Sequence, residues 1–167
     1  MWPTDPPYRA EPENNRCNGA LGPLQPNGAV TRGSISSAGA DVVDRCGSVN
    51  TNGPGVWYCT MGTGGEMMAH TCQNTYFDTK ITIFEGDCDK PICIEGNDDL
   101  CGPTSSFSAV SWQSRFQQVY LILVHGNSDF SGNGNFELAV VSRYNDECST
   151  ALGPLPVSLD HRSLETP

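Results

Sequence analysis

The sequence is poor in basic residues. Lysine and arginine together number 9, against 19 aspartates and glutamates, which gives a formal net charge of −10. Only two of the cationic residues, Lys80 and Lys90, are lysines. Nucleic acids and anionic membranes are bound through basic surfaces. This composition therefore argues against a nucleic-acid-binding protein and against a protein that binds anionic membranes. Cations are the more compatible small ligands.

Long apolar runs are also missing. No stretch approaches the roughly 20 consecutive apolar residues that a transmembrane helix needs. Residues 1–7 have neither the basic start nor the apolar run of a secretion signal. We therefore expect a mature fragment of a larger parent protein, without membrane insertion. A length of 167 residues suits one domain of ordinary size plus tails.

The chain has eight cysteines but no Cys-x-x-Cys pair, the usual sign of a zinc site. An even number of cysteines without such pairs predicts disulfides, and therefore an oxidising, extracellular or cell-surface location. The short spacing of Cys88 and Cys93 is typical of a disulfide across a tight turn. Zinc is the alternative for His70 and Cys72, which lie two residues apart on a predicted strand.

Glycine and proline are abundant, with 18 and 12 copies, which favours short strands joined by turns over long helices. Eight candidate strands cover residues 29–35, 56–61, 66–71, 79–85, 91–95, 106–112, 118–125 and 135–143. We therefore predict an all-β fold, an antiparallel β-sandwich of about eight short strands stapled by disulfides. A helix is the competing interpretation for residues 104–125, because Phe107, Val110 and Phe116 have a spacing that a helix could use. The serine and β-branched residues there favour strands.

Two of the predicted strands differ in their burial pattern. Residues 118–125 are apolar on both faces, which predicts a central strand. In residues 135–143, Phe136, Leu138 and Val140 alternate with Glu137, Ala139 and Val141, which predicts a half-exposed strand.

One motif occurs twice. Residues 17–24 read Cys-Asn-Gly-Ala-Leu-Gly-Pro-Leu, and residues 148–155 read Cys-Ser-Thr-Ala-Leu-Gly-Pro-Leu. The offset of 148 − 17 = 131 residues is one domain length, as in a tandem array. A chance recurrence of this simple motif is the alternative. We predict an acidic, proline-rich linker over residues 1–16, a sandwich over residues 17–144 and the start of a following repeat or a tail over residues 145–167.

Besides the acidic linker, a second acidic segment of the sequence is suited to binding calcium. Calcium takes about six to eight oxygen ligands from carboxylates, amides and carbonyls on loops. Asn97, Asp98 and Asp99 form an acidic turn, and hairpin geometry could bring Asp78 beside them, with Asp87 or Asp89 as further candidates. A solvated turn without a metal is the alternative.

Several segments resemble the pre-peptidase C-terminal (PPC-like) domain, a small β-sandwich appended to secreted bacterial proteases. The matching segments are residues 11–15 (Glu-Pro-Glu-Asn-Asn), the Leu-Gly-Pro-Leu run, residues 77–86, the acidic turn at residues 96–99, and residues 120–126 and 134–138. Residues 54–58 (Pro-Gly-Val-Trp-Tyr) are similar to the cysteine-bearing tandem-repeat form in secreted and cell-surface proteins. The resemblance covers residues 11–141 and implies a jelly-roll-like sandwich with a binding or adhesive role and no catalytic residues.

The resemblance also implies a ligand set and disulfides. In related collagen-binding domains the acidic linker before the first strand helps to hold calcium. The residues that match in type are Glu11, Glu13, Asn14, Asn15, Asp41 and Asp44. Resemblance and proximity to strand ends pair Cys72 with Cys101 and Cys17 with Cys46, which leaves Cys59 and Cys148 as the remaining pair.

These observations favour a non-enzymatic extracellular adhesion or binding module of a tandem-repeat protein. Its expected partners are neighbouring copies of the module and a matrix, glycan or protein ligand. The alternative is a domain that docks a secreted hydrolase on a carbohydrate or protein substrate. An enzyme in its own right, with His125 in a hydrolase triad alongside Asp78 or Asp129, is the third hypothesis. The Gly-x-Ser-x-Gly motif of many hydrolases is missing.

Overall fold

Short strands dominate the described chain. The computed structural model describes residues 10–41, 45–102, 106–127 and 134–143. Within these ranges the chain forms a short 3-10 helix, η1 (Cys17–Gly19), and nine strands, β1 (Leu21–Leu24), β2 (Asn27–Ser34), β3 (Gly55–Met61), β4 (Glu66–Gln73), β5 (Lys80–Glu85), β6 (Ile92–Asp98), β7 (Ala109–Gln113), β8 (Val119–His125) and β9 (Asn135–Arg143). The predicted all-β fold is confirmed, and the stretch from residue 106 to 125 forms strands rather than a helix. No helix in the described ranges is long and apolar enough to cross a membrane.

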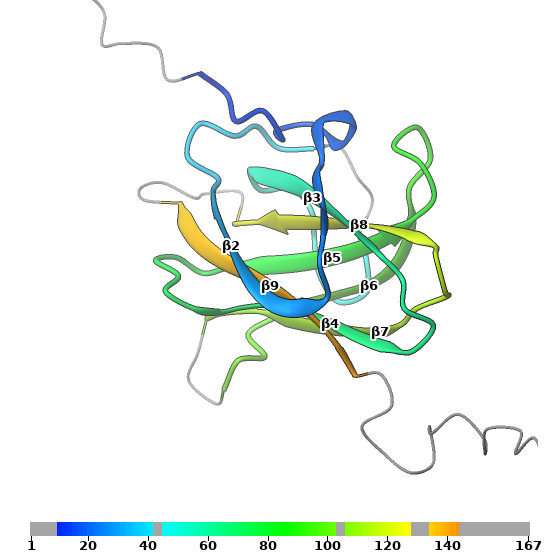
Figure 1. Cartoon of the computed structure of the whole chain (residues 1–167). Helices are drawn as coiled ribbons and strands as arrows, with labels where there is room; N and C mark the ends of the chain where they lie inside the picture. Colours follow the sequence, from blue (N-terminus) through cyan, green and yellow to red (C-terminus); the bar gives the residue numbers. More distant parts are fainter. Residues whose placement is uncertain (1–9, 42–44, 103–105, 128–133, 144–167) are drawn as a thin grey trace, which may run out of the picture.

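The strands form two sheets that pack face to face. One sheet has the order β1-β3-β8-β5-β6 and the other β2-β9-β4-β7. In Figure 1, β9, β4 and β7 of the second sheet lie below β3, β8 and β5 of the first. Neighbouring strands are antiparallel, except that β1 pairs in parallel with β3. The sequence does not predict β1, because Leu-Gly-Pro-Leu is short and its proline cannot donate to a ladder. At the sheet edge that loss is tolerated.

The main core lies between the two sheets. Tyr120, Ile122 and Val124 of β8 point into it and are at most 1% exposed. From the opposite sheet Phe136 meets Tyr58 edge-on, with ring centroids 6.2 Å apart. The intervening residues of β8 are buried on the other face, so the prediction of a central strand apolar on both faces is confirmed.

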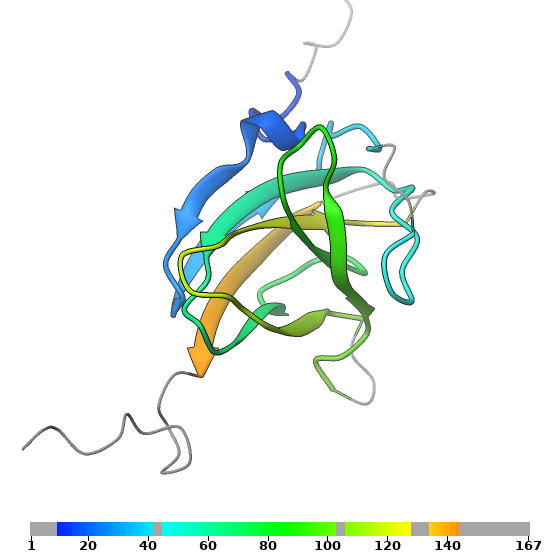
Figure 2. The same ribbon diagram turned by 90° about the vertical axis from the view of Figure 1, so that its right-hand side faces the viewer.

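The outer face of the five-stranded sheet is covered by other parts of the chain. Trp57, Phe84, Leu121 and Leu123 form a second buried cluster with Cys46. Figure 2 shows the blue N-terminal segment beside the green turn between β5 and β6. At Gly96 in β6, an added Cβ would lie 2.5 Å from the Cys46 carbonyl oxygen, so glycine lets this covering segment approach the sheet closely.

Disulfides hold this cover in place. The bonds are Cys17–Cys88, Cys46–Cys93 and Cys72–Cys101. The predicted Cys88–Cys93 and Cys17–Cys46 pairs are therefore wrong. Cys88, in the β5–β6 turn, instead ties down η1, whereas Cys93 of β6 ties down the segment between β2 and β3. These two bonds each join a covering segment to the β5–β6 hairpin beneath it, a relationship that short sequence spacing does not reveal. The third, Cys72–Cys101, joins β4 to the segment that follows β6.

The remaining cysteines bear on two further predictions. The Cys72–Cys101 pair is confirmed, which removes Cys72 as a zinc-binding thiolate beside His70. Cys59 has no disulfide partner within the described residues. Cys148 lies outside them, so the pairing of Cys59 with Cys148 stays a prediction.

The described chain starts and ends at opposite ends of the sandwich. Both views place the blue start at one end and the orange end of β9 at the other. The predicted linker is described from Ala10 onward, and its Asn14 and Asn15 are only 5% and 3% exposed. The predicted start of a following repeat at residues 145–167 lies outside the described residues.

Candidate functional site

Asp78, Asp98 and Asp99 converge at one end of the β5–β6 hairpin. Asp78 precedes β5 and Asp98 ends β6, the neighbouring antiparallel strand. Each residue offers one carboxylate oxygen, and these oxygens lie within 4.8 Å of one another. Among the described residues, no other histidine, cysteine or carboxylate belongs to this group, so Asp87 and Asp89 stay outside it. We call these three residues the acidic cluster.

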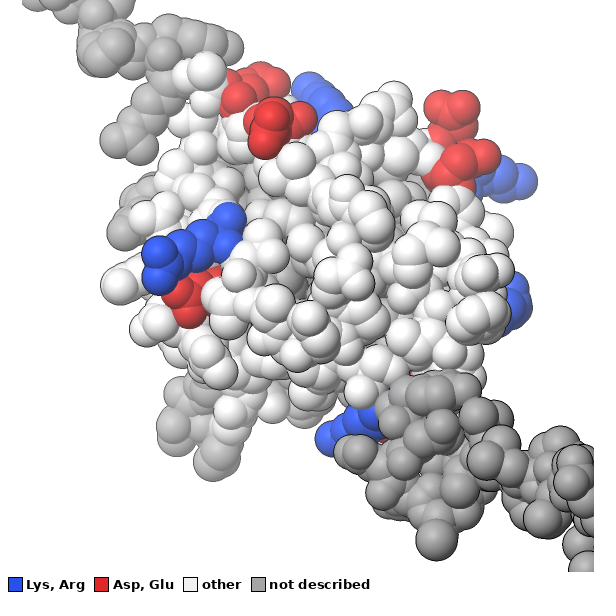
Figure 3. Space-filling model, viewed as in Figure 1, with Lys and Arg blue, Asp and Glu red and all other residues white. Residues whose placement is uncertain are grey.

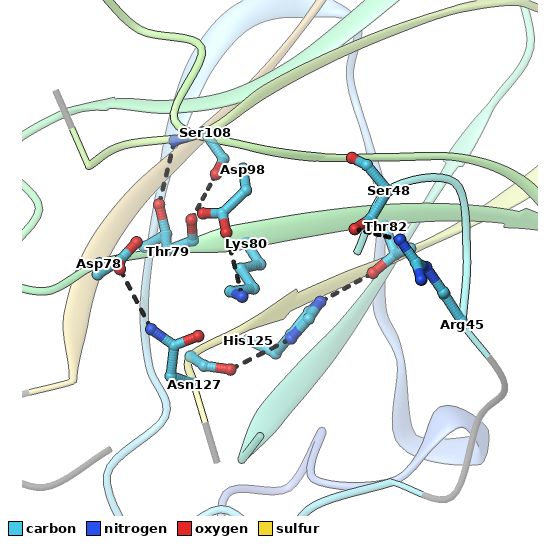
Figure 4. Close-up of polar contacts among 11 residues, drawn as sticks. Arg45, Ser48, Asp78, Thr79, Lys80, Thr82, Asp98, Ser108, His125 and Asn127 are labelled. Atoms are coloured by element: carbon cyan, nitrogen blue, oxygen red, sulfur yellow. Dashed lines mark hydrogen bonds and ion pairs between the residues drawn. The ribbon is translucent and has the colours of Figure 1, made fainter. Parts of the chain in front are cut away.

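Like charges repel one another in the acidic cluster. The pKa of Asp78 is raised, first by burial and then by the neighbouring charges of Asp98 and Asp99. Two contacts offset part of this repulsion, as Figure 4 shows. Lys80 Nζ lies 3.0 Å from Asp98 Oδ2, and Asn127 Nδ2 donates to Asp78 Oδ2 over 3.2 Å. The other oxygen of Asp98, Oδ1, is buried without a hydrogen-bond partner among the described residues.

Asn97 does not join the acidic cluster. Successive residues of a strand point to opposite faces, and Asn97 pairs with Ile81 whereas Asp98 pairs with Lys80. The fourth member of the predicted acidic set therefore points away from the other three.

The linker set is used in packing contacts. Asn14 Nδ2 donates to the Trp57 carbonyl over 2.9 Å. Asn15 Nδ2 donates to Glu11 Oε2 over 2.8 Å, and its Oδ1 accepts from the Gly39 amide over 2.7 Å. These contacts fasten the N-terminal segment to β3 and to the β2–β3 connection.

The carboxylates of the linker set do not gather. Asp41 accepts a 2.6 Å hydrogen bond from Trp57 Nε1, and burial raises its pKa. Glu13 is exposed. Asp44 lies outside the described residues. Within the described residues this set therefore forms no carboxylate group comparable to the acidic cluster.

His125 is buried inside the cover and is not accessible to a substrate. Its exposure is 0%, and its Nε2 lies 2.9 Å from the Thr82 hydroxyl. Its Nδ1 lies 3.3 Å from the Gly126 carbonyl, which can only accept, so Nδ1 carries the proton and Nε2 accepts from Thr82. Burial lowers the pKa of His125 to about 4. The imidazole is thus a neutral structural group.

A hollow of about 740 Å³ opens where β2, β9 and the β4–β5 connection meet. We call it the Tyr76 hollow, after the tyrosine on its rim. Glu137 of β9 lies in it, with a side chain only 11% exposed. Arg32 Nε donates to Glu137 Oε1 over 3.1 Å, and Asn74 Nδ2 donates to Glu137 Oε2 over 2.9 Å.

A second hollow, of about 490 Å³, lies over the disulfide cover. Its lining includes Trp57 and Phe84, whose rings are 5.6 Å apart, together with the Cys17–Cys88 disulfide. Trp57 is 1% exposed, so this hollow offers little aromatic surface to a ligand.

Sequence reasoning missed the residues of the Tyr76 hollow. Arg32 and Glu137 are 105 residues apart and meet only through the register of β2 with β9. Asn74 and Tyr76 follow β4 directly, and a polar residue and an aromatic in one short turn are the only signal that could have drawn attention to them. The pattern of the predicted strands does not reveal which turn lies beside which strand.

Comparisons with known proteins give no family. No family model matches the sequence, and no curated protein matches it. Among solved structures the chain is similar to PliG of Aeromonas hydrophila, described as a periplasmic lysozyme inhibitor of g-type lysozyme. The identity is 15%, the match covers 69% of this chain and 85% of that chain, and the TM-score is 0.45. A likeness this remote assigns neither a ligand nor an activity, and the PPC-like resemblance stays a prediction.

Proposed function

We propose that this chain is a non-enzymatic binding module that works in an extracellular or other oxidising compartment. The observation that carries the proposal is the set of three disulfides, two of which fasten covering segments to the outer face of one sheet. Such bonds persist in secreted proteins and are rare in the reducing cytosol. They make the surface a rigid frame, which is what a binding module requires.

The accessible chemistry of the described surface suits binding better than turnover. The catalytic candidate His125 is buried and neutral, and Cys72 is in a disulfide. The acidic cluster and the Tyr76 hollow, by contrast, are open to solvent. Both hold polar groups in fixed positions.

The test is ligand capture by the oxidised protein. The protein would be passed over immobilised polysaccharides and matrix proteins, and the eluted material would be checked for cleavage products. We expect saturable capture by one ligand class, without products, and loss of capture after the disulfides are reduced. If cleavage products still form after every reagent used in the preparation has been replaced, the non-enzymatic assignment is overturned. If no ligand class captures the protein, the binding role is overturned.

Calcium is a proposed ligand of the acidic cluster rather than of the linker. Three carboxylates within reach of one ion, and the buried Asp98 Oδ1 without a hydrogen-bond partner, fit an ion that prefers oxygen ligands. Lys80 occupies only the other oxygen of Asp98. Bound calcium would replace the repulsion between Asp78 and its neighbours by attraction, and so would stiffen the end of the β5–β6 hairpin.

Thermal unfolding in EDTA and then in millimolar calcium separates the two predicted sites. Calcium at about 100 times its dissociation constant would add roughly 2.7 kcal/mol to the free energy of unfolding. We expect Asp78→Asn with Asp99→Asn to abolish the rise in midpoint. The matched control, Glu11→Gln with Glu13→Gln, would keep it. The opposite pattern would return calcium to the linker, and no rise in the wild type would remove calcium from the account.

A tandem array with an adhesive role is the finer proposal. The repeated Cys-x-x-Ala-Leu-Gly-Pro-Leu motif supports it, and a sandwich whose described ends point in opposite directions can be strung into a chain. Weak contacts of tethered modules then combine through effective concentration. Further copies of the motif in the parent gene would support the array. A catalytic domain there would instead support a role in docking a secreted hydrolase.

A further inference from the structure

The Tyr76 hollow combines an exposed aromatic ring with fixed polar groups. Its volume of about 740 Å³ falls inside the range of about 300–1,000 Å³ that is typical of ligand sites. It is assembled from three segments, β2, β9 and the turn after β4, on the rigid frame of the four-stranded sheet. A site on such a frame keeps its geometry before a ligand arrives.

Glu137 is positioned by its neighbours. Arg32 holds one carboxylate oxygen and Asn74 the other, at 3.1 and 2.9 Å. These hydrogen bonds lower the pKa of Glu137, and the bond from Asn74 has a larger effect than the bond from Arg32. The carboxylate therefore stays charged and acts only as an acceptor. Each oxygen has a further lone pair, and a ligand hydroxyl could donate to it.

Asn74 is held in an uncommon backbone conformation. Its φ is +38°, in the left-handed region that few residues other than glycine and asparagine enter. This conformation accompanies the hydrogen bond from the amide nitrogen of Asn74 to Glu137, which leaves the amide oxygen of the same side chain as an acceptor. The guanidinium of Arg32, in a side chain that is 86% exposed, adds planar donors on the other side of Glu137.

Tyr76 supplies a flat apolar surface beside these groups. It is 68% exposed, yet its backbone is fixed, because its amide donates to the Asn135 carbonyl over 3.2 Å. An aromatic ring with one polar end is suited to contacts that are apolar on one side and wet on the other. A sugar ring has this character, with C–H groups on its face and hydroxyls at its edge.

Charge selects among the sugars. Arg32 and Glu137 neutralise each other, so the hollow carries no net charge from this pair. On the face drawn in Figure 3, charged side chains lie mainly at the margins. The whole chain carries −10, which repels polyanions. An uncharged glycan meets no such repulsion.

We propose that the Tyr76 hollow binds a neutral glycan, with a pyranose ring stacked on Tyr76 and its hydroxyls bonded to Arg32, Asn74 and Glu137. This inference rests on the proposed binding function and names a ligand class and a site for it. Stacking supplies contact area, and the three polar side chains set the orientation of the sugar.

The test compares neutral and anionic polymers that share one backbone. Hydroxyethylcellulose and carboxymethylcellulose form one such pair, and galactomannan and xylan extend the neutral set. Retardation in native gels that contain each polymer gives the affinity of the oxidised protein. We expect one or more neutral polymers to retard it, and carboxymethylcellulose to retard it less than its neutral counterpart.

Variants then locate the site. Tyr76→Ala should weaken binding about tenfold or more, the loss expected for roughly 1.4 kcal/mol of stacking. Tyr76→Phe, which keeps the ring, should stay within about threefold of the wild type. Asn74→Ala should also weaken binding, because Glu137 loses a partner and the ligand loses an acceptor. Phe116→Ala is the matched control, since Phe116 is 72% exposed but lies in the turn between β7 and β8, outside the hollow.

The outcomes separate this inference from the proposed function. If no neutral polymer binds, or the anionic polymer binds more tightly, the glycan inference fails. Capture by a protein ligand in the same preparation would leave the binding module intact. Neutral-glycan binding that is unchanged in Tyr76→Ala, with an unchanged melting midpoint, would overturn the site. Loss in Tyr76→Ala with retention in Phe116→Ala would support it.

Discussion

Cys17 and Cys88 are bonded to each other across 71 residues, with their Cα atoms 5.5 Å apart. This bond ties η1 to the turn between β5 and β6, above the buried Trp57. The outer face of the five-stranded sheet therefore depends on a covalent link between two segments that are distant in sequence.

Removing this bond should uncover the sheet. For Cys17→Ala with Cys88→Ala, the chain-entropy model gives a loss of about 4 kcal/mol in the free energy of unfolding. Urea unfolding measures the loss, and acrylamide quenching of tryptophan fluorescence should increase as the cover loosens. Cys72→Ala with Cys101→Ala is the control, with a stability loss of similar order but no increase in quenching. Equal quenching in both variants would contradict the role of the Cys17–Cys88 bond.

Thr79 should stabilise the sandwich through its hydroxyl group. Its Oγ1 lies 2.6 Å from Thr71 Oγ1 and accepts from the Ser108 amide over 3.2 Å, and all three residues are 0% exposed. Thr79→Val would remove the hydroxyl that both partners contact and leave the Ser108 amide only its 3.2 Å bond to Thr71 Oγ1, so we expect a loss of about 1 kcal/mol. Thr79→Ser keeps the hydroxyl and should lose less. Denaturant midpoints test the order, and a valine variant as stable as the serine variant would contradict it.

Acidification should destabilise the fold through His125. Its pKa falls from 6.5 to about 4 on folding, so between these values the unfolded chain binds a proton that the folded chain excludes. Stability is therefore full above about pH 6.5 and falls toward pH 4, by about 3 kcal/mol in total. Asp41 and Asp78, with raised pKa values, act with the opposite sign.

A His125→Gln variant isolates this contribution. Glutamine does not titrate, so the difference in unfolding free energy between wild type and variant should shrink as the pH falls from 7 to 5. A constant difference across that range would show that His125 does not supply the pH dependence. Subtracting the unfolding free energy of the variant from that of the wild type also removes the contributions of the carboxylates, which both proteins share.

Eight of the nine strands of the described chain were predictable, because each of the eight carries its own pattern. Alternation at Phe136, Leu138 and Val140 identified β9, and apolar residues on both faces identified β8 as central. β1 was not predictable from pattern, because it has four residues, two of them Gly22 and Pro23, and forms only by pairing in parallel with β3.

The sites were less predictable, because they depend on which segments of the chain lie side by side in the fold. The acidic cluster was partly foreseen, since Asp78 and Asp98 sit at the same end of one hairpin. The linker set stays a prediction as a ligand group, and the sequence does not reveal that its buried Asn14 bonds to the backbone of β3. The Tyr76 hollow was not foreseen at all, since the register of β2 with β9 brings Arg32 to Glu137.

Peptide mapping of the oxidised protein without reduction tests the central claim most directly. A disulfide-held module of an oxidising compartment should yield linked peptides for Cys17–Cys88, Cys46–Cys93 and Cys72–Cys101, with Cys59 linked to none of these six. Free thiols at the six positions in protein recovered from its native compartment, or the pairs Cys88–Cys93 and Cys17–Cys46, would contradict the account.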